Sequence, residues 1–464
     1  MTSRRDQVQA YSFVQGRLTS ALVHGEPDAV QPPMQRTRSA TLGGVVLGML
    51  GIAGFLLWGL ISPVDKAAAA PTTGDLIVVS QTGASYIYGG GKLYPVLNWS
   101  SARMLLDGSP QVENETAAAI AGIPQGTTLG IVGAPDSLPT EVNHGDWLAC
   151  AEESGGQPKS AVAIGVSSPA VASVSSDQAL VVTRGSGSSY LIWQGQRLRL
   201  DATWMASALG LGQAPVTQVS QTWLNAVPAG PDLQAFSLNG AGDPGPTLDG
   251  QATRVGEVLV TQNVGGGDAF FLVESDGVAA ITATQAALDL ASPGTAAAYP
   301  GGTAQPVTVS APAIASAPHG SQSLPDGTDV PASPPSAATP PKASDVPCIA
   351  YPGTGGAAPV LLWTAPPGGS APDLQAPGVK GSATDADLVS VGSGGGALVQ
   401  PLTATGAATG PLYLVTDAGV KFAVPSTDEA TALGYQASQA ARLPATLLGL
   451  LPTGPSLNLA PLSG

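Results

Sequence analysis

Leu42-Gly-Gly-Val-Val-Leu-Gly-Met-Leu-Gly-Ile-Ala-Gly-Phe-Leu-Leu-Trp-Gly-Leu-Ile61 is the stretch of sequence that decides how this chain of 464 residues is organised. No charged residue occurs between Arg38 and Asp65. As a helix, the run would be about 30 Å long, which matches the hydrocarbon core of a bilayer. The rest of the sequence contains no second run of this kind. The sequence therefore predicts one transmembrane helix at residues 42–62, with a small head before it and nearly all the mass after it.

The charges on the two sides of the run indicate its orientation. Five basic and three acidic residues precede it, whereas 12 basic and 29 acidic residues follow it. Basic residues close to a membrane span stay in the cytoplasm, so we expect a cytoplasmic N-terminus and an exported body. The alternative is a signal peptide cleaved near Ala67–Pro71. The apolar run exceeds a usual signal-peptide core and the head is too long for such a peptide, which favours a retained anchor.

The head contains one apolar stripe with the spacing of a helix. Its members recur every three or four residues and are Val8, Tyr11, Val14, Leu18 and Leu22. The pattern predicts a helix that ends near His24-Gly25. Two interpretations stay open: a helix that packs on the membrane surface, and a docking helix for a cytoplasmic partner.

Composition narrows the class of the exported body. Aromatic residues make up 5% of the chain, and there are 60 glycines and 42 prolines, which indicates turn-rich structure built from small residues. The acidic surface offers no positive patch for phosphates, so we expect no nucleic-acid binding. The two cysteines, Cys150 and Cys348, both follow the anchor. In an oxidising compartment such a pair most simply forms one disulfide, and the alternative is two free buried thiols.

A pattern of strand, tight turn, strand and capped helix returns four times in the exported body. The copies begin at Ser85, Ser189, Ala269 and Leu412, and a short feeder strand precedes each. Asp-Gly and Gln-Gly pairs at the turns are expected to supply the positive φ that hairpins require. Helix N-caps are expected at Asn98, Asp201, Thr282 and Ser426. Each copy is too small to stand well alone, so the sequence predicts four duplicated modules.

The cysteines lie in similar settings between these copies. Each precedes a Gly-rich turn and an apolar strand, and a valine follows each cysteine after twelve positions (Val162 and Val360). We interpret the two settings as half-domains that pair into a central sheet with pseudo-twofold symmetry, pinned by a Cys150–Cys348 disulfide. The predicted fold class is α+β: a single transmembrane helix, then an elongated exported body of four small α/β repeat modules around a central β domain.

The expected boundaries follow from these patterns. We expect a cytoplasmic head with an amphipathic helix at residues 1–41, the transmembrane helix at 42–62 and a linker at 63–73. The exported body is then divided, in chain order, into repeat 1 at 74–126, half 1 of the central domain at 127–175, repeat 2 at 176–236, repeat 3 at 252–291, an extended and mobile linker rich in Pro, Ala and Ser at 292–342, half 2 of the central domain at 343–385, repeat 4 at 386–454 and a C-terminal tail at 455–464.

A search for catalytic and ligand-binding motifs yields little. Gly89-Gly-Gly-Lys92 resembles the end of a phosphate-binding loop, but Leu93 stands where Ser or Thr is needed, which favours a hairpin turn. His24, His144 and His319 lie far apart and lack metal-ligand spacing. Glu141–Asp146 combines a histidine with carboxylates, but a polar turn is the better interpretation. The sequence therefore predicts no catalytic, cofactor-binding or metal-binding residues.

The anchor itself indicates a membrane partner. Gly44, Gly48 and Gly51 follow one another at intervals that leave part of the helix surface without side chains. Such surfaces allow close contact between membrane helices. We therefore predict that these glycines pack against another membrane protein.

In combination, these features resemble one known family. The head Ser3-Arg-Arg-Asp-Gln-Val-Gln-Ala-Tyr-Ser-Phe-Val-Gln-Gly-Arg-Leu-Thr-Ser-Ala-Leu-Val23, the Pro33-Met34 pair, the single span, the two distant cysteines and the four repeats are similar to the EccB component of type VII (ESX) secretion systems. The resemblance implies a single-pass subunit of an inner-membrane secretion complex. Its implied partners are the EccC motor ATPase, the EccD and EccE membrane subunits, a second copy of itself and the cell wall.

Two functions remain open at this stage. The first is a structural core subunit that anchors the complex and extends into the periplasm and cell wall. Its candidate contact aromatics are Tyr86, Tyr88, Tyr190, Trp193 and Tyr413, although alternate strand residues face a core. The second is a membrane-bound ATPase or nucleotide hydrolase, because family members carry that label. ATP enters as a cofactor through the label alone, and the incomplete phosphate loop favours the structural subunit.

Overall fold

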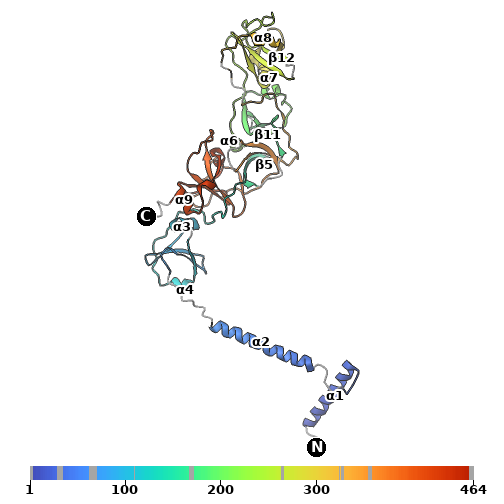
Figure 1. Ribbon diagram of the computed structural model, residues 1–464, viewed down its shortest axis with the longest axis vertical. Coiled ribbons are helices and arrows are strands. Elements are labelled where there is room, and N and C mark those ends of the chain that lie inside the picture. Colours follow the sequence, from blue (N-terminus) through green and yellow to red (C-terminus); the bar gives the residue numbers. More distant parts are fainter. Residues whose placement is uncertain are drawn as a thin grey trace. The chain divides into compact units, whose positions relative to one another are not determined.

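The computed structural model describes residues 4–28, 35–61, 71–108, 110–166, 172–185, 187–262, 266–322, 324, 329–353 and 358–458. The chain forms two compact units, Met1–Pro71 and Thr72–Gly464. Most of the expected linker at 63–73 and the end of the expected C-terminal tail at 455–464 lie outside the described residues. Figure 1 shows the helical first unit in blue and the β-rich second unit in the remaining colours.

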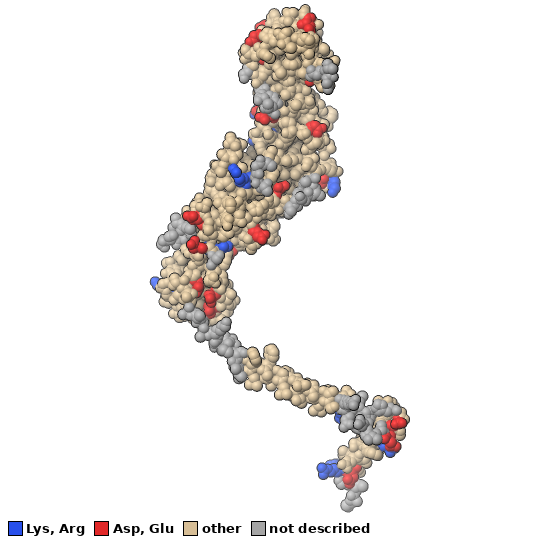
Figure 2. Space-filling view, in the orientation of Figure 1, with Lys and Arg blue, Asp and Glu red and all other residues tan. Residues whose placement is uncertain are grey.

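The first unit consists of two helices, α1 (Arg4–His24) and α2 (Gln35–Ile61). Helix α1 ends where predicted, because Gly25 takes φ +71° and donates its N–H to Ala21 O. The apolar stripe of α1 is exposed within this unit. Within α2, Thr37–Trp58 is long and apolar enough to cross a membrane, and Figure 2 shows its surface almost free of charged residues. The helix begins earlier than the predicted span, at Gln35.

Repeat 1 shows the plan that all four repeats share. Its sheet has the order β3-β2-β1-β4, in which β1 and the β2-β3 hairpin are antiparallel and β4 is parallel to β1. A parallel neighbour requires a crossover, and the capped helix provides it. The elements are β1 (Leu76–Val79), β2 (Ser85–Gly89), β3 (Lys92–Pro95), α3 (Trp99–Leu105), β4 (Val112–Glu115) and α4 (Ala117–Ile120).

The other three repeats have the same strand order and the same parallel fourth strand. Repeat 2 comprises β8 (Gln178–Thr183), β9 (Ser189–Trp193), β10 (Gln196–Leu200), α5 (Trp204–Ala208), β11 (Val216–Gln218) and α6 (Gln221–Ala226). Repeat 3 comprises β12 (Val258–Gln262), β13 (Asp268–Val273), β14 (Val278–Ile281), α7 (Ala283–Ala291), η1 (Pro293–Ala297), β15 (Val307–Thr308) and α8 (Ala311–Ser316). Repeat 4 comprises β20 (Gly396–Leu402), β21 (Leu412–Thr416), β22 (Lys421–Val424), α9 (Thr427–Ala432), η2 (Ala437–Gln439), β23 (Ala441–Pro444) and α10 (Ala445–Leu448).

Each repeat continues beyond the predicted pattern with a fourth strand and a second helix, and a motif in the sequence marks this second half. After the second helix, every copy carries an apolar residue followed by Pro-x-Gly, and we call this the Pro-x-Gly segment: 123–126, 227–230, 317–320 and 451–454. In each copy, the residue between Pro and Gly pairs in parallel with the second hairpin strand. The glycine is needed because a Cβ at Gly126, Gly230 or Gly454 would lie within 2.5 Å of a hairpin side chain.

The predicted linker at 292–342 is wrong. Its first part completes repeat 3: Val307 pairs with Leu259, and Ser310 caps α8 by accepting a hydrogen bond from Ala313 N. Further along, β16 (Ser336–Ala337) pairs with β8 of repeat 2. Pro, Ala and Ser do not prevent this order, because Pro is tolerated in the first turn of a helix and Ser is a strong N-cap.

The capping predictions hold at three of four sites. Asn98, Thr282 and Ser426 each accept a backbone N–H at a helix start. Asp201 does not cap α5, because its carboxylate is paired with Arg199 instead. The N-cap residue of α5 is Thr203, which makes no side-chain capping bond.

The prediction of positive φ at the hairpin turns also fails once. Gly91, Gly195 and Gly419 take φ values of +76°, +74° and +71°. Gly277 has no positive φ. It is required for space instead, because a Cβ there would lie 2.4 Å from Pro318 O in the Pro-x-Gly segment of repeat 3.

The central sheet has the order β19-β6-β5-β17-β18-β7. Its halves are the hairpins β5 (Asp146–Ser154) with β6 (Gln157–Val166) and β17 (Val346–Tyr351) with β18 (Val360–Thr364). The strand after each half crosses to the far edge of the other half: β7 (Ala172–Ser173) pairs with β18, and β19 (Leu388–Val391) pairs with β6. The predicted boundary at 386 therefore needs correction, because β19 belongs to the central sheet.

The equivalence drawn between Val162 and Val360 is also wrong. Val162 lies opposite Ala149, one residue before Cys150, whereas Val360 lies opposite Ala350, two residues after Cys348. The pseudo-twofold axis passes between the cysteines, which lie directly opposite each other. The two hairpins differ in loop length, so equal spacing from the cysteines does not give equivalent places.

The tight contact of the Pro-x-Gly segments predicts a stability effect. Gly454→Ala places a Cβ about where the ring of Phe422 lies, at 2.2 Å, and that ring is buried in the core of repeat 4. We expect a loss of about 2 kcal/mol in the free energy of unfolding. Urea denaturation of the full-length chain, followed by tryptophan fluorescence, measures it.

Gly302→Ala is the matched control, because a Cβ there meets nothing within 4 Å. Equal denaturation midpoints for the two variants would show that the Pro-x-Gly segments tolerate a side chain.

Candidate functional site: the central sheet and the repeats that dock on it

Cys150 and Cys348 form the predicted disulfide at the centre of the second unit, with an S–S distance of 2.03 Å. Both cysteines are fully buried on neighbouring antiparallel strands, β5 and β17. One face of the sheet packs around them with Leu148, Ala163 and Leu362. The bond therefore joins two segments 198 residues apart at the pseudo-twofold axis.

The opposite face of the central sheet is the docking surface for repeats 2 and 4. Trp147, Ala149 and Ile349 of the sheet share one core with residues of both repeats. Trp223 of α6 is fully buried there, and its indole Nε1 donates a 2.9 Å hydrogen bond to Ala149 O. Tyr351 donates its hydroxyl to Ala226 O at the end of α6, and burial raises the pKa of this hydroxyl far above its ordinary value.

The second helix of each repeat decides whether that repeat docks. In repeats 2 and 4 this helix carries two large buried apolar residues, Trp223-Leu224 and Leu447-Leu448. The equivalent pairs in repeats 1 and 3 are Ala119-Ile120 and Ala313-Ile314, and neither α4 nor α8 contains a buried residue. A bulky pair therefore distinguishes the two repeats that dock from the two that do not.

A half-buried cation accompanies each docked helix. Arg197 on β10 donates to Leu224 O, and Lys421 on β22 donates to Leu448 O at 2.6 Å. The two residues are equivalent in the pseudo-twofold arrangement, and cations near a helix C-terminus are favourable. Burial lowers the pKa of Lys421. Repeats 1 and 3 carry Leu93 and Val278 at this position, which shows the same division between docked and undocked repeats.

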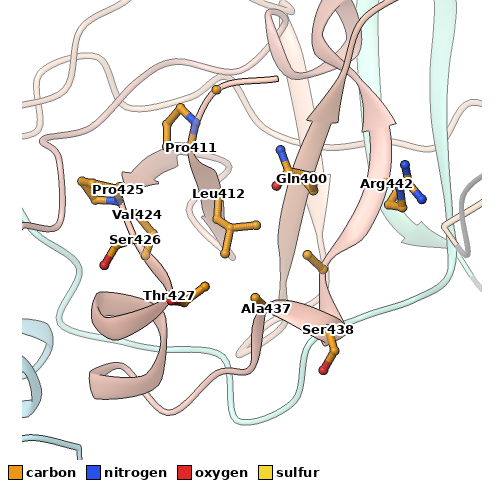
Figure 3. A pocket seen from close by; sticks show the side chains of 12 residues that line it. Gln400, Pro411, Leu412, Val424, Pro425, Ser426, Thr427, Ala437, Ser438 and Arg442 are labelled. Atoms are coloured by element: carbon orange, nitrogen blue, oxygen red, sulfur yellow. The ribbon is translucent and has the colours of Figure 1, made fainter. Parts of the chain in front are cut away.

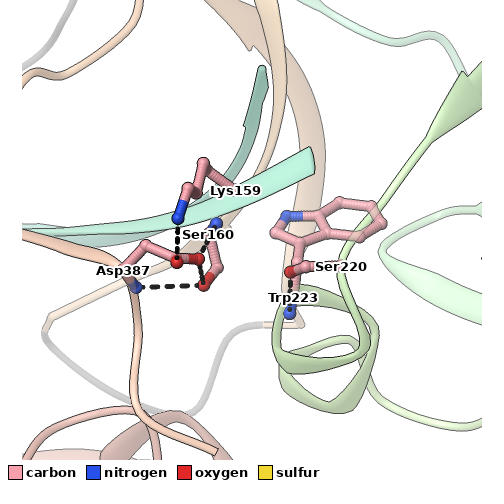
Figure 4. Close-up of polar contacts among 5 residues, drawn as sticks. All are labelled: Lys159, Ser160, Ser220, Trp223 and Asp387. Carbon is pink, nitrogen blue, oxygen red and sulfur yellow. Dashed lines mark hydrogen bonds and ion pairs between the residues drawn. The ribbon is translucent and has the colours of Figure 1, made fainter. Parts of the chain in front are cut away.

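Asp387 holds the start of β19 against β6 within the central sheet. Figure 4 shows its carboxylate between Lys159 and Ser160 of β6, just before β19 begins. Lys159 Nζ lies 2.8 Å from Asp387 Oδ1, and the backbone N–H and the hydroxyl of Ser160 donate to Oδ2 at 2.9 and 3.0 Å. Burial alone would raise the pKa of Asp387, but the hydrogen bonds from Lys159 and Ser160 outweigh it and lower the pKa.

The outer repeats are attached through helix pairs. Helix α3 of repeat 1 contacts α9 of repeat 4, and α5 of repeat 2 contacts α7 of repeat 3. Met104 of α3 belongs to the core of repeat 4, and Leu288 of α7 belongs to the core of repeat 2. The four repeats therefore form two pairs, and one member of each pair docks on the central sheet.

A buried carboxyl group that the sequence patterns did not predict lies close to the contact between repeats 2 and 3. Asp289 on α7 is buried and accepts a hydrogen bond from the backbone N–H of Phe236. Burial raises its pKa to about 6. The sequence does contain a signal for this group, because Asp289 stands next to the apolar residues of α7. A charged residue on the buried face of a helix is rare.

The five candidate aromatics divide into two groups, and all are half-buried. Tyr190 and Tyr413 pack against the main core, and Trp193 packs against the core of repeat 2. Trp193 also donates its indole N–H to Ser176 O. Tyr86 and Tyr88 of repeat 1 belong to none of the described cores, so they are the two that stay available as contact residues.

The segments considered for chemistry are turns in the structure. Gly89–Lys92 spans the β2-β3 hairpin turn, where Gly90 and Gly91 take positive φ. Asn143, within the segment Glu141–Asp146, donates to Gly165 O and accepts from Gly145 N. These contacts shape loops beside the central sheet.

A cavity of about 370 Å³ lies in repeat 4. Figure 3 shows Gln400 and Arg442 on one side of it and Pro411, Pro425 and Ser426 on the other. Its walls combine proline rings with hydroxyls and one exposed cation.

The glycines of the anchor lie on α2, and a Cβ at Gly44, Gly48 or Gly51 would meet nothing within 4 Å in this chain. The surface they form is therefore open in the first unit. Their contact with another membrane helix stays a prediction.

Comparison with known proteins gives matches over the whole chain. The family model described as "Type VII secretion system ESX-1, transport TM domain B" matches residues 1–461. The ESX-5 secretion system ATPase EccB5 of Mycobacterium tuberculosis is 31% identical over 290 residues, which cover 60% of this chain and 56% of the relative. The ESX-2 secretion system ATPase EccB2 of the same species is 32% identical over 295 residues, which cover 60% and 57%. The alignments thus span little more than half of these curated relatives.

Solved structures share the fold. A chain of an intact ESX-5 inner membrane complex gives a TM-score of 0.65 at 25% identity, covering 100% of this chain and 95% of that one. An EccB3 dimer from the ESX-3 core complex gives a TM-score of 0.65 at 23% identity, covering 84% and 99%. The second likeness concerns the fold alone.

Loss of the disulfide should lower stability without changing the strand pairing. Because the bond closes a loop of 198 residues, the chain-entropy model predicts a loss of roughly 5 kcal/mol in the free energy of unfolding on reduction. Urea denaturation of the full-length chain, with and without a phosphine reductant, measures it. The Cys150→Ala/Cys348→Ala variant should have the same denaturation midpoint as the reduced protein, and the reductant should not change that midpoint. A midpoint that does not move on reduction would contradict this account.

Asp387→Asn should lower stability at neutral pH by about 1 kcal/mol, because it removes a partly exposed ion pair and weakens two hydrogen bonds. The folded-state pKa of Asp387 is lowered, so its contribution is present above the unfolded value near 4 and is lost as the pH falls through the folded value. The variant and the parent should therefore converge at acid pH in urea titrations.

Asp268→Asn, at an exposed position where β13 begins, is the control and should leave the titration unchanged. A gap between Asp387→Asn and the parent that stays the same size as the pH falls from neutral would show that the carboxylate charge is not what holds β19.

Proposed function

The chain belongs to the EccB family of type VII secretion systems, and on that premise we propose that it is a structural subunit of a type VII secretion membrane complex. One observation carries the proposal. Repeats 2 and 4 dock on a central sheet that one disulfide crosslinks, through the bulky pairs of α6 and α10 and the half-buried cations Arg197 and Lys421, and repeats 1 and 3 attach to these two. The exported body is thus built as a scaffold.

The single apolar helix supports a role as anchor. Helix α2 is long enough to span a bilayer, and five basic residues precede the apolar run. In our proposal the head is cytoplasmic, the chain crosses the inner membrane once, and the second unit lies outside the cytoplasm. The acidic excess of the second unit supports this orientation.

The proposed partners are the other membrane subunits of the complex. A solved chain with this fold comes from an intact ESX-5 inner membrane complex, and another comes from an EccB3 dimer. We propose that this chain likewise assembles with a motor ATPase (EccC), with the EccD and EccE membrane subunits and with a second copy of itself. Tyr86 and Tyr88 are our candidates for contact with the cell wall, since they lie outside the described cores.

The name ATPase, which the curated relatives carry, gains no support from the residues that the sequence singled out. Gly89–Lys92 forms a hairpin turn between two strands, whereas a phosphate-binding loop opens a helix whose N-terminus faces the phosphate. We therefore propose the scaffold and not a nucleotide hydrolase.

Assembly through the anchor can be tested by affinity purification. The tagged full-length chain is extracted in a gentle detergent, and co-purified proteins are identified by mass spectrometry. Gly44→Leu/Gly48→Leu should reduce recovery of a multispanning subunit and a motor ATPase by several-fold, because leucine side chains prevent close helix contact.

Gly43→Leu is the control for an added leucine, since Gly43 lies on a different side of the same helix from Gly44 and Gly48. Recovery of the parent chain alone under the mildest conditions would overturn the scaffold proposal and call for a hydrolase assay.

A further inference from the structure

The four Pro-x-Gly segments make the same two hydrogen bonds, but their outer edges differ. In repeat 2, Arg197 N donates to Pro228 O and Gly230 N donates to Arg197 O. In repeat 4, Lys421 N donates to Pro452 O and Gly454 N donates to Lys421 O. The middle residues, Ala229 and Thr453, therefore point their own backbone N–H and C=O groups away from the hairpin.

In repeat 4 this outer edge is already occupied. Residues 365–387, which connect β18 to β19 and which we call the strap, run past the Pro-x-Gly segment. Lys380 N donates to Thr453 O at 2.7 Å, and Thr453 N donates to Lys380 O at 3.0 Å. The strap thus adds an antiparallel strand of minimal length to the edge.

Repeat 2 is the pseudo-twofold counterpart of repeat 4, but the connection that corresponds to the strap is much shorter. Residues 167–171 alone connect β6 to β7, in place of the whole of 365–387. Ala229 is exposed, and no residue in the described part of the chain bonds to its backbone N–H or C=O. Unpaired backbone groups on such an edge are a template for another strand.

A cavity of about 200 Å³ adjoins this open edge. It is lined by Ala229 itself, by Tyr190 and by the charged residues Arg197, Arg199 and Asp232. Arg199 is paired with Asp201, whereas Arg197 has a carbonyl partner and no carboxylate within ion-pair distance in the described ranges. The equivalents of Arg199 and Asp232 in repeat 4 are Ala423 and Ser456, so the charged lining is particular to repeat 2.

From these observations we infer that the Pro-x-Gly edge of repeat 2 binds an extended peptide strand of a partner protein, with a carboxylate side chain opposite Ala229. The strand takes the place that the strap takes in repeat 4. In an antiparallel pair, residues directly opposite each other present their side chains on the same face, so the carboxylate lies on the face where Ala229 lines the cavity. There it meets Arg197, the arginine of the lining that has no carboxylate partner in the described ranges.

The inference goes beyond the scaffold role, because it names a second binding surface on the exported body. Peptide binding can fail while the membrane complex still assembles, and assembly can fail while the peptide still binds. The two proposals therefore stand or fall on separate measurements.

The strap supplies the probe for a test. A fluorescent peptide of residues 372–383, Pro-Asp-Leu-Gln-Ala-Pro-Gly-Val-Lys-Gly-Ser-Ala, is titrated with the full-length chain in detergent, and a second peptide carries Lys380→Glu. Fluorescence polarisation should show saturable binding, with the glutamate peptide binding about tenfold more tightly. Absence of saturable binding by both peptides would overturn the inference.

Two variants locate the site. Ala229→Pro removes the outward N–H, and Ala229 makes neither of the two inner bonds, so affinity should fall about fivefold. Arg197→Gln removes the charge, so the preference for the glutamate peptide should disappear in a variant whose denaturation midpoint equals that of the parent. Gln125→Pro, at the equivalent place in repeat 1, is the control and should leave binding unchanged.

The outcomes for these three variants test whether the peptide binds at the Pro-x-Gly edge of repeat 2. Affinity that is unchanged in Ala229→Pro, in a variant whose denaturation midpoint equals that of the parent, would contradict binding at this edge. If Ala229→Pro fails to fold, Arg197→Gln still decides the charge preference. An equal loss in Gln125→Pro would assign the effect to general disturbance and overturn the site.

Discussion

The pairing of β5 with β17 is the contact on which the second unit depends. It joins residues that lie almost 200 positions apart, and it places Cys150 directly opposite Cys348. Contacts between such distant segments carry a large cost in loop entropy, and the disulfide reduces that cost by constraining the unfolded chain. Once the pair has formed, β6 and β18 extend the sheet on either side, and the strands that leave each half cross to the edge of the other. The halves are therefore interlocked by backbone hydrogen bonds as well as by one covalent bond.

The docked repeats use a recurring set of contacts. A bulky pair on the second helix enters the main core, and a cation from the hairpin meets the carbonyl at the end of that helix. The same module without the bulky pair and the cation stays off the sheet and attaches through its first helix instead. Duplication thus produced one module with two modes of attachment, and a few side chains distinguish them. This economy explains how a chain with few aromatic residues builds several cores: the two fully buried tryptophans, Trp147 and Trp223, both lie where three parts of the body meet.

The second unit departs from its pseudo-twofold symmetry in two features. The strap covers the Pro-x-Gly edge of repeat 4, whereas the same edge of repeat 2 is open and lies beside two arginines. Repeat 3 holds buried carboxyl groups, Glu274 and Asp289, within a body that otherwise buries few charges. A symmetric scaffold needs neither feature. Both lie in parts of the chain where selection for packing alone would have favoured apolar or paired residues.

The sequence by itself determined the elements that depend on local chemistry. Uninterrupted apolar length identified the anchor, alternation and turn residues identified the hairpins, and an even pair of cysteines in an exported chain identified the disulfide. The tertiary structure alone decided what depends on neighbours. Asp201 does not cap a helix because its carboxylate pairs with Arg199, and Gly277 is necessary for space and not for φ. The described parts of 292–342 form strands and a helix because repeats 3 and 2 supply strands for them to pair with. The open edge at Ala229 could not have been inferred from spacing, because it exists only where one half of the chain provides a strap and the other does not. Local propensity acts over a few residues, whereas pairing partners are chosen by the fold as a whole, and this is why the elements could be predicted and their contacts could not.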